Sequence, residues 1–241
     1  MRFADADHRE GEPSRHCFSG PPLDPTRAPA AADSLLVRVE KTVMTLSRHS
    51  APALQPYERE RVARYVRESD ARDYQAAHLL AREVVASLTG TKISAVEFVQ
   101  TCGYCGAVGH GRPSIVADDS VSVSWSHTRG VVAAAAARAH AVGVDVEGSR
   151  GWTRVPRFID AAMTPAEAAE IRNATDPESA FLRLWTRKES MIKIGTLSLD
   201  RLADVSAESR PGVSLTSWYD EEAAAWIGLS VVHQDRGDGV Q

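Results

Sequence analysis

Residues 176–195, DPESAFLRLWTRKESMIKIG, predict a long helix that carries charged side chains on one face. An Asp-Pro pair is typical of a helix start and a glycine of a helix end. Trp185, Glu189 and Lys193 recur every four residues, so they follow one stripe of this helix. The tryptophan indicates that the stripe is at least partly buried. The helix alone also allows an ordinary surface pair between Glu189 and Lys193.

Working outward from this helix, a second acidic motif precedes it at residues 143–147, GVDVE. Side chains alternate along a strand, so Asp145 and Glu147 share one face and the two valines face a core. Two carboxylates on one face repel each other unless a cation lies between them, and Mg²⁺ prefers oxygen ligands. Glu189 could complete such a site, with Lys193 beside a phosphate. A solvated strand face with two unrelated acids is the alternative.

A third motif lies upstream at residues 120–130, SVSVSWSHTRG. Residues 121–125 predict a strand, and Ser126 and His127 are expected where it ends. This Ser-His pair is no hydrolase signature, because neighbouring side chains on a strand diverge. A serine and a histidine at a strand end can instead donate to an anion. A structural histidine is the plainer reading of the same pattern.

The order of the elements predicts an α+β protein of two packed subdomains. Residues 1–33, rich in proline and poor in large apolar side chains, are expected to form a flexible arm. We expect subdomains at residues 34–138 and 139–241, with a seam near residues 137–142. Strands are predicted at residues 35–39, 93–99, 121–125, 131–137, 142–147, 213–219 and 225–232. Helices are predicted from Pro56 toward Glu68, from an N-cap at Asp70 to Gly90, and after a capping box at Thr164 and Glu167.

The composition narrows the class of protein further. The chain has 241 residues, 43% of them hydrophobic and 25% charged, with a net charge of −4. A chain-wide basic footprint for nucleic acid is therefore absent. No apolar run approaches the roughly 20 residues that cross a bilayer, and no secretory signal is visible. Three cysteines suit a reducing cytoplasm, so we expect a cytoplasmic protein without a membrane or nucleic-acid partner.

The motifs GVDVE, WTRKESMIK and SWSHT together resemble those of the Sfp-type 4′-phosphopantetheinyl transferases. The family pattern is a Gly-hydrophobic-Asp-hydrophobic-Glu strand, a Trp-[Ser/Thr]-x-Lys-Glu-x-x-x-Lys helix and an upstream Ser-His strand end. HGRP at residues 110–113 looks like the family's Gly-Lys-Pro element, with Arg112 in the lysine place. The resemblance covers residues 56–205. It departs from the pattern at Ser124 and at Arg129.

This resemblance implies a fold of two similar α/β subdomains with pseudo-twofold symmetry and coenzyme A bound between them. It implies that Asp145, Glu147 and Glu189 are ligands of Mg²⁺ or Mn²⁺. The metal would bridge the coenzyme A pyrophosphate, and Lys193 would contact the phosphates near the leaving group. Asp145, Glu189 and Lys193 would therefore be the catalytic residues. Glu189, or a water on the metal, would take the proton of the attacking serine.

The resemblance also implies contacts with the nucleotide end of coenzyme A. Ser126 and His127 would contact this end, including the 3′-phosphate, and Arg112 would do likewise. Arg61 would add a phosphate contact from the N-terminal helix. Asp145 and Lys193 would complete the cofactor-binding set.

The implied activity is transfer of 4′-phosphopantetheine from coenzyme A to a serine of an apo acyl or peptidyl carrier protein, with release of adenosine 3′,5′-bisphosphate. The carrier could serve fatty acid, polyketide or nonribosomal peptide biosynthesis, and we expect the enzyme to be a monomer. A basic patch could receive the acidic carrier, formed by Arg187 and Lys188 or by Arg154 and Arg157. Lys188 could instead orient the catalytic network or serve only as an ion-pair partner.

Two other functions compete with this one. Another metal-dependent phosphotransferase or phosphohydrolase would use the same acids on a nucleotide pyrophosphate. A zinc-assisted binding module would use Cys102, Cys105 and His110, because C-x-x-C is half of a zinc knuckle. A structural zinc site would want a fourth ligand such as Cys17 or His78, and no second C-x-x-C exists. Reduced thiols in a turn are therefore the default expectation.

Overall fold

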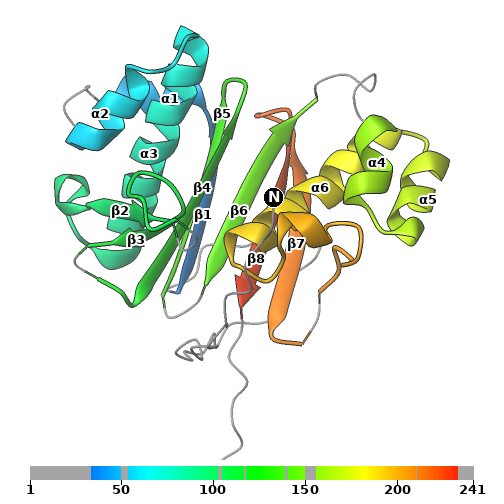
Figure 1. The fold of residues 1–241 in the computed structure, drawn as a ribbon. Helices are drawn as coiled ribbons and strands as arrows, with labels where there is room; N and C mark the ends of the chain where they lie inside the picture. Colours follow the sequence, from blue (N-terminus) through cyan, green and yellow to red (C-terminus); the bar gives the residue numbers. More distant parts are fainter. Residues whose placement is uncertain are drawn as a thin grey trace, which may run out of the picture.

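Figure 1 shows the fold of the chain in a computed structural model. The structure describes residues 34–49, 54–102, 105–116, 118–138, 141–149, 156–209 and 211–232. The predicted arm at residues 1–33, Cys17 within it, and Arg154 all lie outside the described residues. No helix in the described part of the chain combines the length and the apolar character that a bilayer crossing needs.

Groups of helices lie between groups of antiparallel strands along the chain, which makes the fold mixed α/β. The strands are β1 (Leu35–Lys41), β2 (Phe98–Thr101), β3 (Arg112–Ile115), β4 (Val121–Thr128), β5 (Val131–Arg138), β6 (Val142–Gly148), β7 (Val213–Asp220) and β8 (Ala225–Val232). The helices are α1 (Thr42–Arg48), α2 (Pro56–Val62), α3 (Glu68–Thr89), α4 (Pro156–Ala162), α5 (Pro165–Asn173) and α6 (Pro177–Lys193), with 3₁₀ turns at Ile93–Ala95 and Leu199–Arg201.

Two three-stranded antiparallel sheets share one pattern of connection. The first has the order β1-β5-β4 and the second the order β6-β8-β7. In each sheet, the strand that comes first in the chain is followed by a long helix, α3 or α6, and then by a hairpin. This first strand pairs with the second strand of the hairpin. Figure 1 shows the two sheets next to each other, with α3 beside the first and α6 beside the second. The predicted combination of helices and antiparallel strands is confirmed.

The small residues of β5 allow it to be buried on both faces. Val132, Ala134 and Ala136 pack with α3, whereas Ala133 and Ala135 join the cluster that lies between the two sheets. The same inner cluster holds Val144 and Val146 of β6. The predicted core face of the GVDVE strand is therefore confirmed, and the opposite face of β6 remains for α6.

Two glycines set how closely α6 approaches the second sheet. A Cβ at Gly143 of β6 would overlap the carbonyl oxygen of Ser190, and one at Gly228 of β8 would overlap the backbone of Thr186. Both positions lack that atom, so the helix backbone lies directly on β6 and β8. This contact brings the charged stripe of α6 against the acidic face of β6.

Serine side chains join the two sheets at the seam between β4 and β6. The Ser122 hydroxyl accepts from the Val142 N–H at 3.2 Å, and the Ser124 hydroxyl accepts from the Val144 N–H at 3.1 Å. These hydroxyls satisfy backbone donors of β6 that a neighbouring strand would otherwise bind. The polar face of the SVSVSWSHT strand therefore serves the contact between the sheets.

Several predicted boundaries are corrected. The helix expected to run from Pro56 toward Glu68 ends at Val62, where α2 closes. A separate helix, α3, begins at Glu68 with Arg67 as its N-cap, so Asp70 lies in its first turn and is not the cap.

Two predicted strands also differ. Residues 93–95 form a 3₁₀ turn and the strand begins only at Phe98, whose side chain is buried. β4 extends to Thr128 because Ser126 and His127 pair with Ala133 and Val132 of β5. The predicted end at residue 125 is therefore too early.

Candidate active site

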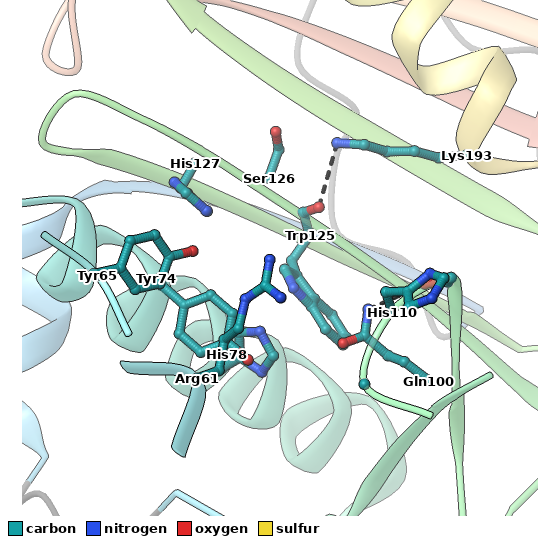
Figure 2. A pocket seen from close by; sticks show the side chains of 12 residues that line it. Arg61, Tyr65, Tyr74, His78, Gln100, His110, Trp125, Ser126, His127 and Lys193 are labelled. Carbon is teal, nitrogen blue, oxygen red and sulfur yellow. Dashed lines mark hydrogen bonds between the residues drawn. The ribbon is translucent and has the colours of Figure 1, made fainter. Parts of the chain in front are cut away.

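A pocket of about 320 Å³ opens between the first sheet, α2, α3 and the end of α6 (Figure 2). Its size lies in the range of small-molecule sites. Most of the lining side chains are polar or aromatic. They are Arg61, Tyr65, Tyr74, His78, Gln100, Gly109, His110, Gly111, Trp125, Ser126, His127 and Lys193.

Lys193, at the last residue of α6, ties that helix to both sheets. Its Nζ donates to the Asp145 Oδ1 at 2.9 Å and to the Val144 carbonyl oxygen at 2.8 Å, both on β6. It also donates to the Trp125 carbonyl oxygen of β4 at 3.3 Å, the contact drawn in Figure 2. The lysine also lines the pocket, so its charge lies at the junction of the sheets where a ligand can reach it.

Asp145 is buried and only half satisfied. Its Oδ1 accepts from Lys193 and from the Ser126 hydroxyl, the latter at 2.7 Å. Its Oδ2 is buried and has no hydrogen-bond partner among the described residues. Buried carboxylate oxygens without a partner are rare because their desolvation is costly. An oxygen of this kind is suited to a cation or a ligand donor that binds at the site.

Glu189 lies one turn before Lys193 on the half-buried face of α6. Burial, together with the nearby carboxylates of Asp145 and Glu147, raises the pKa of its carboxyl to about 7, and Lys193 opposes the shift. The electrostatic effect of Asp145 and Glu147 shows that the three acids lie near one another. Glu147 also accepts from the Thr128 hydroxyl of β4 at 3.2 Å.

The donor set of these three acids fits a hard divalent cation, which takes carboxylate oxygens. The partnerless Oδ2 of Asp145 and the crowding of like charges both favour such an ion. Their oxygens do not all lie within 4.8 Å of one another, since the one group of described residues that meets this distance is Cys102, Cys105 and His110. The three carboxylates would therefore move closer together to ligate an ion.

Ser126 and His127 diverge, as expected of neighbours on a strand. The Ser126 hydroxyl points to β6 and bonds Asp145, whereas His127 lies on the α3 side of β4. Burial lowers the pKa of His127, with Asp73 opposing the shift, so the imidazole is neutral at pH 7. Both residues line the pocket. The bond from Ser126 to Asp145 was not predicted from the sequence.

Arg61 and Arg112 occupy different positions relative to the pocket. Arg61 of α2 lines the pocket, and Figure 2 shows its guanidinium group pointing into it. Arg112 is exposed at the start of β3 and does not belong to the lining, although the preceding residue, Gly111, does. The structure therefore brings Arg61 into the pocket and leaves Arg112 beside its rim.

An aromatic wall beside the pocket was missed by sequence reasoning. The rings of Tyr74 and His78 lie 4.1 Å apart, and those of His78 and Trp125 lie 4.7 Å apart, measured between centroids. Below them, Glu58 is fully buried and pairs with His78 Nδ1 at 2.6 Å and with Arg82 at 2.7 Å. The i, i+4 spacing of Tyr74, His78 and Arg82 on the predicted helix is the signal that could have found this wall.

The two readings left open for Lys188 are resolved by its burial. The Lys188 side chain is fully buried and pairs with Glu167 of α5 at 2.7 Å. It also donates to the Leu202 carbonyl oxygen at 2.5 Å, and Glu167 accepts from the Ala207 N–H at 2.6 Å. Lys188 is therefore an internal ion-pair partner, and its place in a surface patch for a carrier was predicted wrongly.

The remaining basic candidates for a carrier patch differ in exposure. Arg187 Nε donates to the Ser217 hydroxyl at 2.8 Å, which holds it against β7. Arg157 on α4 is exposed.

Comparison with known proteins finds a family match in the second half of the chain. Residues 141–229 match the sequence model of the 4′-phosphopantetheinyl transferase superfamily. The chain therefore carries a domain of that superfamily, which spans β6 to most of β8 and includes Asp145, Glu147, Glu189 and Lys193. No curated protein matches the chain significantly.

The superfamily transfers phosphopantetheine, with coenzyme A as substrate, carrier proteins as acceptors and typically a divalent metal. The match at residues 141–229 therefore indicates phosphopantetheine transfer as the general kind of activity.

Proposed function

We propose that the chain is an Sfp-type enzyme that transfers 4′-phosphopantetheine from coenzyme A to a serine of an apo acyl or peptidyl carrier protein. The observation that carries this proposal is the partnerless, buried Oδ2 of Asp145 beside Lys193 and the end of the pocket. An anionic diphosphate and a cation would satisfy this arrangement together.

The pocket would bind the nucleotide end of coenzyme A. Arg61 and Lys193 supply positive charge from two different elements, and His127 supplies a neutral ring nitrogen that can donate to the 3′-phosphate. The aromatic side chains of the wall offer apolar surface to the adenosine. Arg112 could reach the phosphate from the rim, because a guanidinium suits phosphate geometry. Ser126 would act mainly through Asp145, which it already contacts.

In the proposed reaction, the carrier serine oxygen forms a bond to the β-phosphorus of coenzyme A. The bond from that phosphorus to the bridging oxygen breaks, and adenosine 3′,5′-bisphosphate leaves with the bridging oxygen. Phosphoryl transfer depends mainly on alignment and charge stabilisation. Lys193 stabilises the charge that develops on the leaving group. Glu189 accepts the serine proton directly or through a water.

Asp145, Glu147 and Glu189 would hold Mg²⁺, or Mn²⁺, against the diphosphate of coenzyme A. The ion supplies neutralisation of phosphate charge. Asp145 is oriented for this role by the two donors on its Oδ1, which leave Oδ2 for the ion.

We further propose that residues 34–138 and 139–241 act as two subdomains related by a pseudo-twofold axis. The shared connectivity of the two sheets supports this division. We expect the enzyme to act as a cytoplasmic monomer on carriers of fatty acid, polyketide or nonribosomal peptide synthesis. A panel of apo carriers from the three classes, incubated with coenzyme A and Mg²⁺ and weighed by mass spectrometry, tests this. The proposal predicts a gain of one phosphopantetheine group on at least one carrier.

A further inference from the structure

The loop between β2 and β3 folds back so tightly that distant residues meet. The Cys102 N–H donates to the Ala107 carbonyl oxygen at 3.0 Å, and the Gly106 N–H donates to the Cys102 carbonyl oxygen at 2.9 Å. Gly111 has a φ of +97°, and a Cβ there would lie 2.6 Å from the Thr101 carbonyl oxygen. Only glycine fits this approach.

The closed loop brings three metal-binding side chains together. The ligand atoms of Cys102, Cys105 and His110 all lie within 4.8 Å of one another, and the Cys105 Sγ lies 3.3 Å from the His110 Nε2. Tetrahedral zinc with bonds of about 2.3 Å to sulfur and about 2.0–2.1 Å to nitrogen places these two ligand atoms about 3.6 Å apart. The spacing of these ligand atoms in the loop is therefore close to zinc-binding geometry.

We propose that Cys102, Cys105 and His110 bind one zinc ion that fixes the β2–β3 loop at the rim of the pocket. Two thiolates and an imidazole favour Zn²⁺ over Mg²⁺, which prefers oxygen ligands. This site is therefore chemically distinct from the three carboxylates. The exposure of Cys105 and His110 leaves the fourth position to solvent.

Neither of the extra ligands considered from the sequence is needed. His78 is buried, and its Nδ1 is bound to Glu58 at 2.6 Å, so it belongs to the network beneath the aromatic wall. Cys17 lies outside the described residues and serves as a control below.

The position of the loop gives the ion a structural role for the enzyme. Gly109, His110 and Gly111 line the pocket, and the Gly111 carbonyl oxygen accepts from the Gln100 side chain at 3.0 Å. Arg112 follows directly. An ion on Cys102, Cys105 and His110 would hold this rim in one conformation and so limit the entropy lost when a ligand binds.

Metal analysis of the full chain, expressed with zinc and purified with a thiol reductant and without chelator, tests the site. We expect one equivalent of zinc for each chain. Replacement by Co²⁺ should give the thiolate-to-cobalt charge-transfer absorption, which an ion on carboxylates cannot produce. Zinc below a tenth of an equivalent, with no such absorption after Co²⁺ addition, would overturn the proposal.

Variants assign the ligands. Cys105→Ser and His110→Ala should each lower the affinity for zinc by about tenfold or more. His110→Cys keeps a zinc ligand at this position and should therefore still bind zinc. Circular dichroism checks the fold, and His110→Ala keeps the test valid if Cys105→Ser fails to fold. Cys17→Ser and Asp145→Asn are the matched controls and should keep both zinc and the cobalt absorption. Zinc that survives Cys105→Ser but is lost in Cys17→Ser would contradict the assignment.

Discussion

Lys193 of α6 forms an ion pair with Asp145 of β6, with 2.9 Å between Nζ and Oδ1, and also donates to the Trp125 carbonyl oxygen of β4. One side chain thus links the two sheets at the point where the pocket meets the carboxylates. The sequence alone left open a surface pair between Lys193 and Glu189. The structure instead pairs Lys193 with the buried Asp145, which places its charge inside the candidate site.

Lys193→Ala should lower kcat for carrier modification by about 10²-fold or more, because a preorganised cation stabilises the leaving group most in the transition state. Binding of coenzyme A should weaken less, since Arg61 and His127 remain in the pocket. Steady-state kinetics and calorimetry measure the two effects separately. Lys193→Arg is the control and should restore kcat only in part. An unchanged kcat with a slightly lower Tm would assign Lys193 a purely structural role.

The metal-free protein should lose stability as the pH rises from about 4.5 to about 7. The pKa of Glu189 is raised from 4.5 to about 7 in the folded chain, so the folded state holds a proton that the unfolded state releases. The contribution is complete below about pH 4.5 and is lost as the pH passes 7. Denaturant unfolding in EDTA at about pH 5 and about pH 8 measures it.

Glu189→Gln is the matched control for this pH effect. The variant should show a smaller fall in the free energy of unfolding between the two pH values, because the glutamine does not titrate. Addition of Mg²⁺ should stabilise the wild-type chain more than the variant at about pH 8. An equal pH dependence in the two proteins would show that the folded chain does not raise the pKa of Glu189.

Dephospho-coenzyme A should bind about tenfold or more weakly than coenzyme A. The missing 3′-phosphate removes charge-assisted contacts that are worth about 1.5–3 kcal/mol. Titration calorimetry with both ligands measures this ratio. His127→Ala and Arg61→Ala should each reduce it. Should the ratio in both variants equal that of the wild type, the 3′-phosphate binds elsewhere.

Lys188→Met should destabilise the fold without impairing the chemistry. The lysine is fully buried and pairs with Glu167, and removal of one partner of a buried pair typically costs about 3–5 kcal/mol. The variant should therefore unfold at a lower denaturant concentration, while kcat at low temperature stays close to the wild-type value. A large drop in kcat with unchanged stability would show that Lys188 acts in the catalytic network and is not only an ion-pair partner.

Local patterns in the sequence predicted much of this fold. The bounds of β8 agree with the prediction, and the Thr164–Glu167 capping box is present because each side chain bonds the other residue's backbone N–H. The alternation in GVDVE also placed Val144 and Val146 in the core.

Features that depend on distant residues escaped prediction. The bond from Ser126 to Asp145 joins two strands of different sheets, and no spacing in the chain signals it. The close approach of α6 to β6 depends on Gly143 facing Ser190, a contact that only tertiary packing reveals. The extension of β4 through His127 likewise depends on pairing with β5.

The most direct test of the account measures both products of one reaction. Wild-type protein, coenzyme A, Mg²⁺ and an apo carrier that accepts the group should yield adenosine 3′,5′-bisphosphate and phosphopantetheinyl carrier in equal amounts. Asp145→Asn, which keeps the side-chain shape but removes the charge, should yield neither product although it remains folded. Bisphosphate released without a modified carrier would identify a phosphohydrolase. Full activity in Asp145→Asn would contradict the three-carboxylate site.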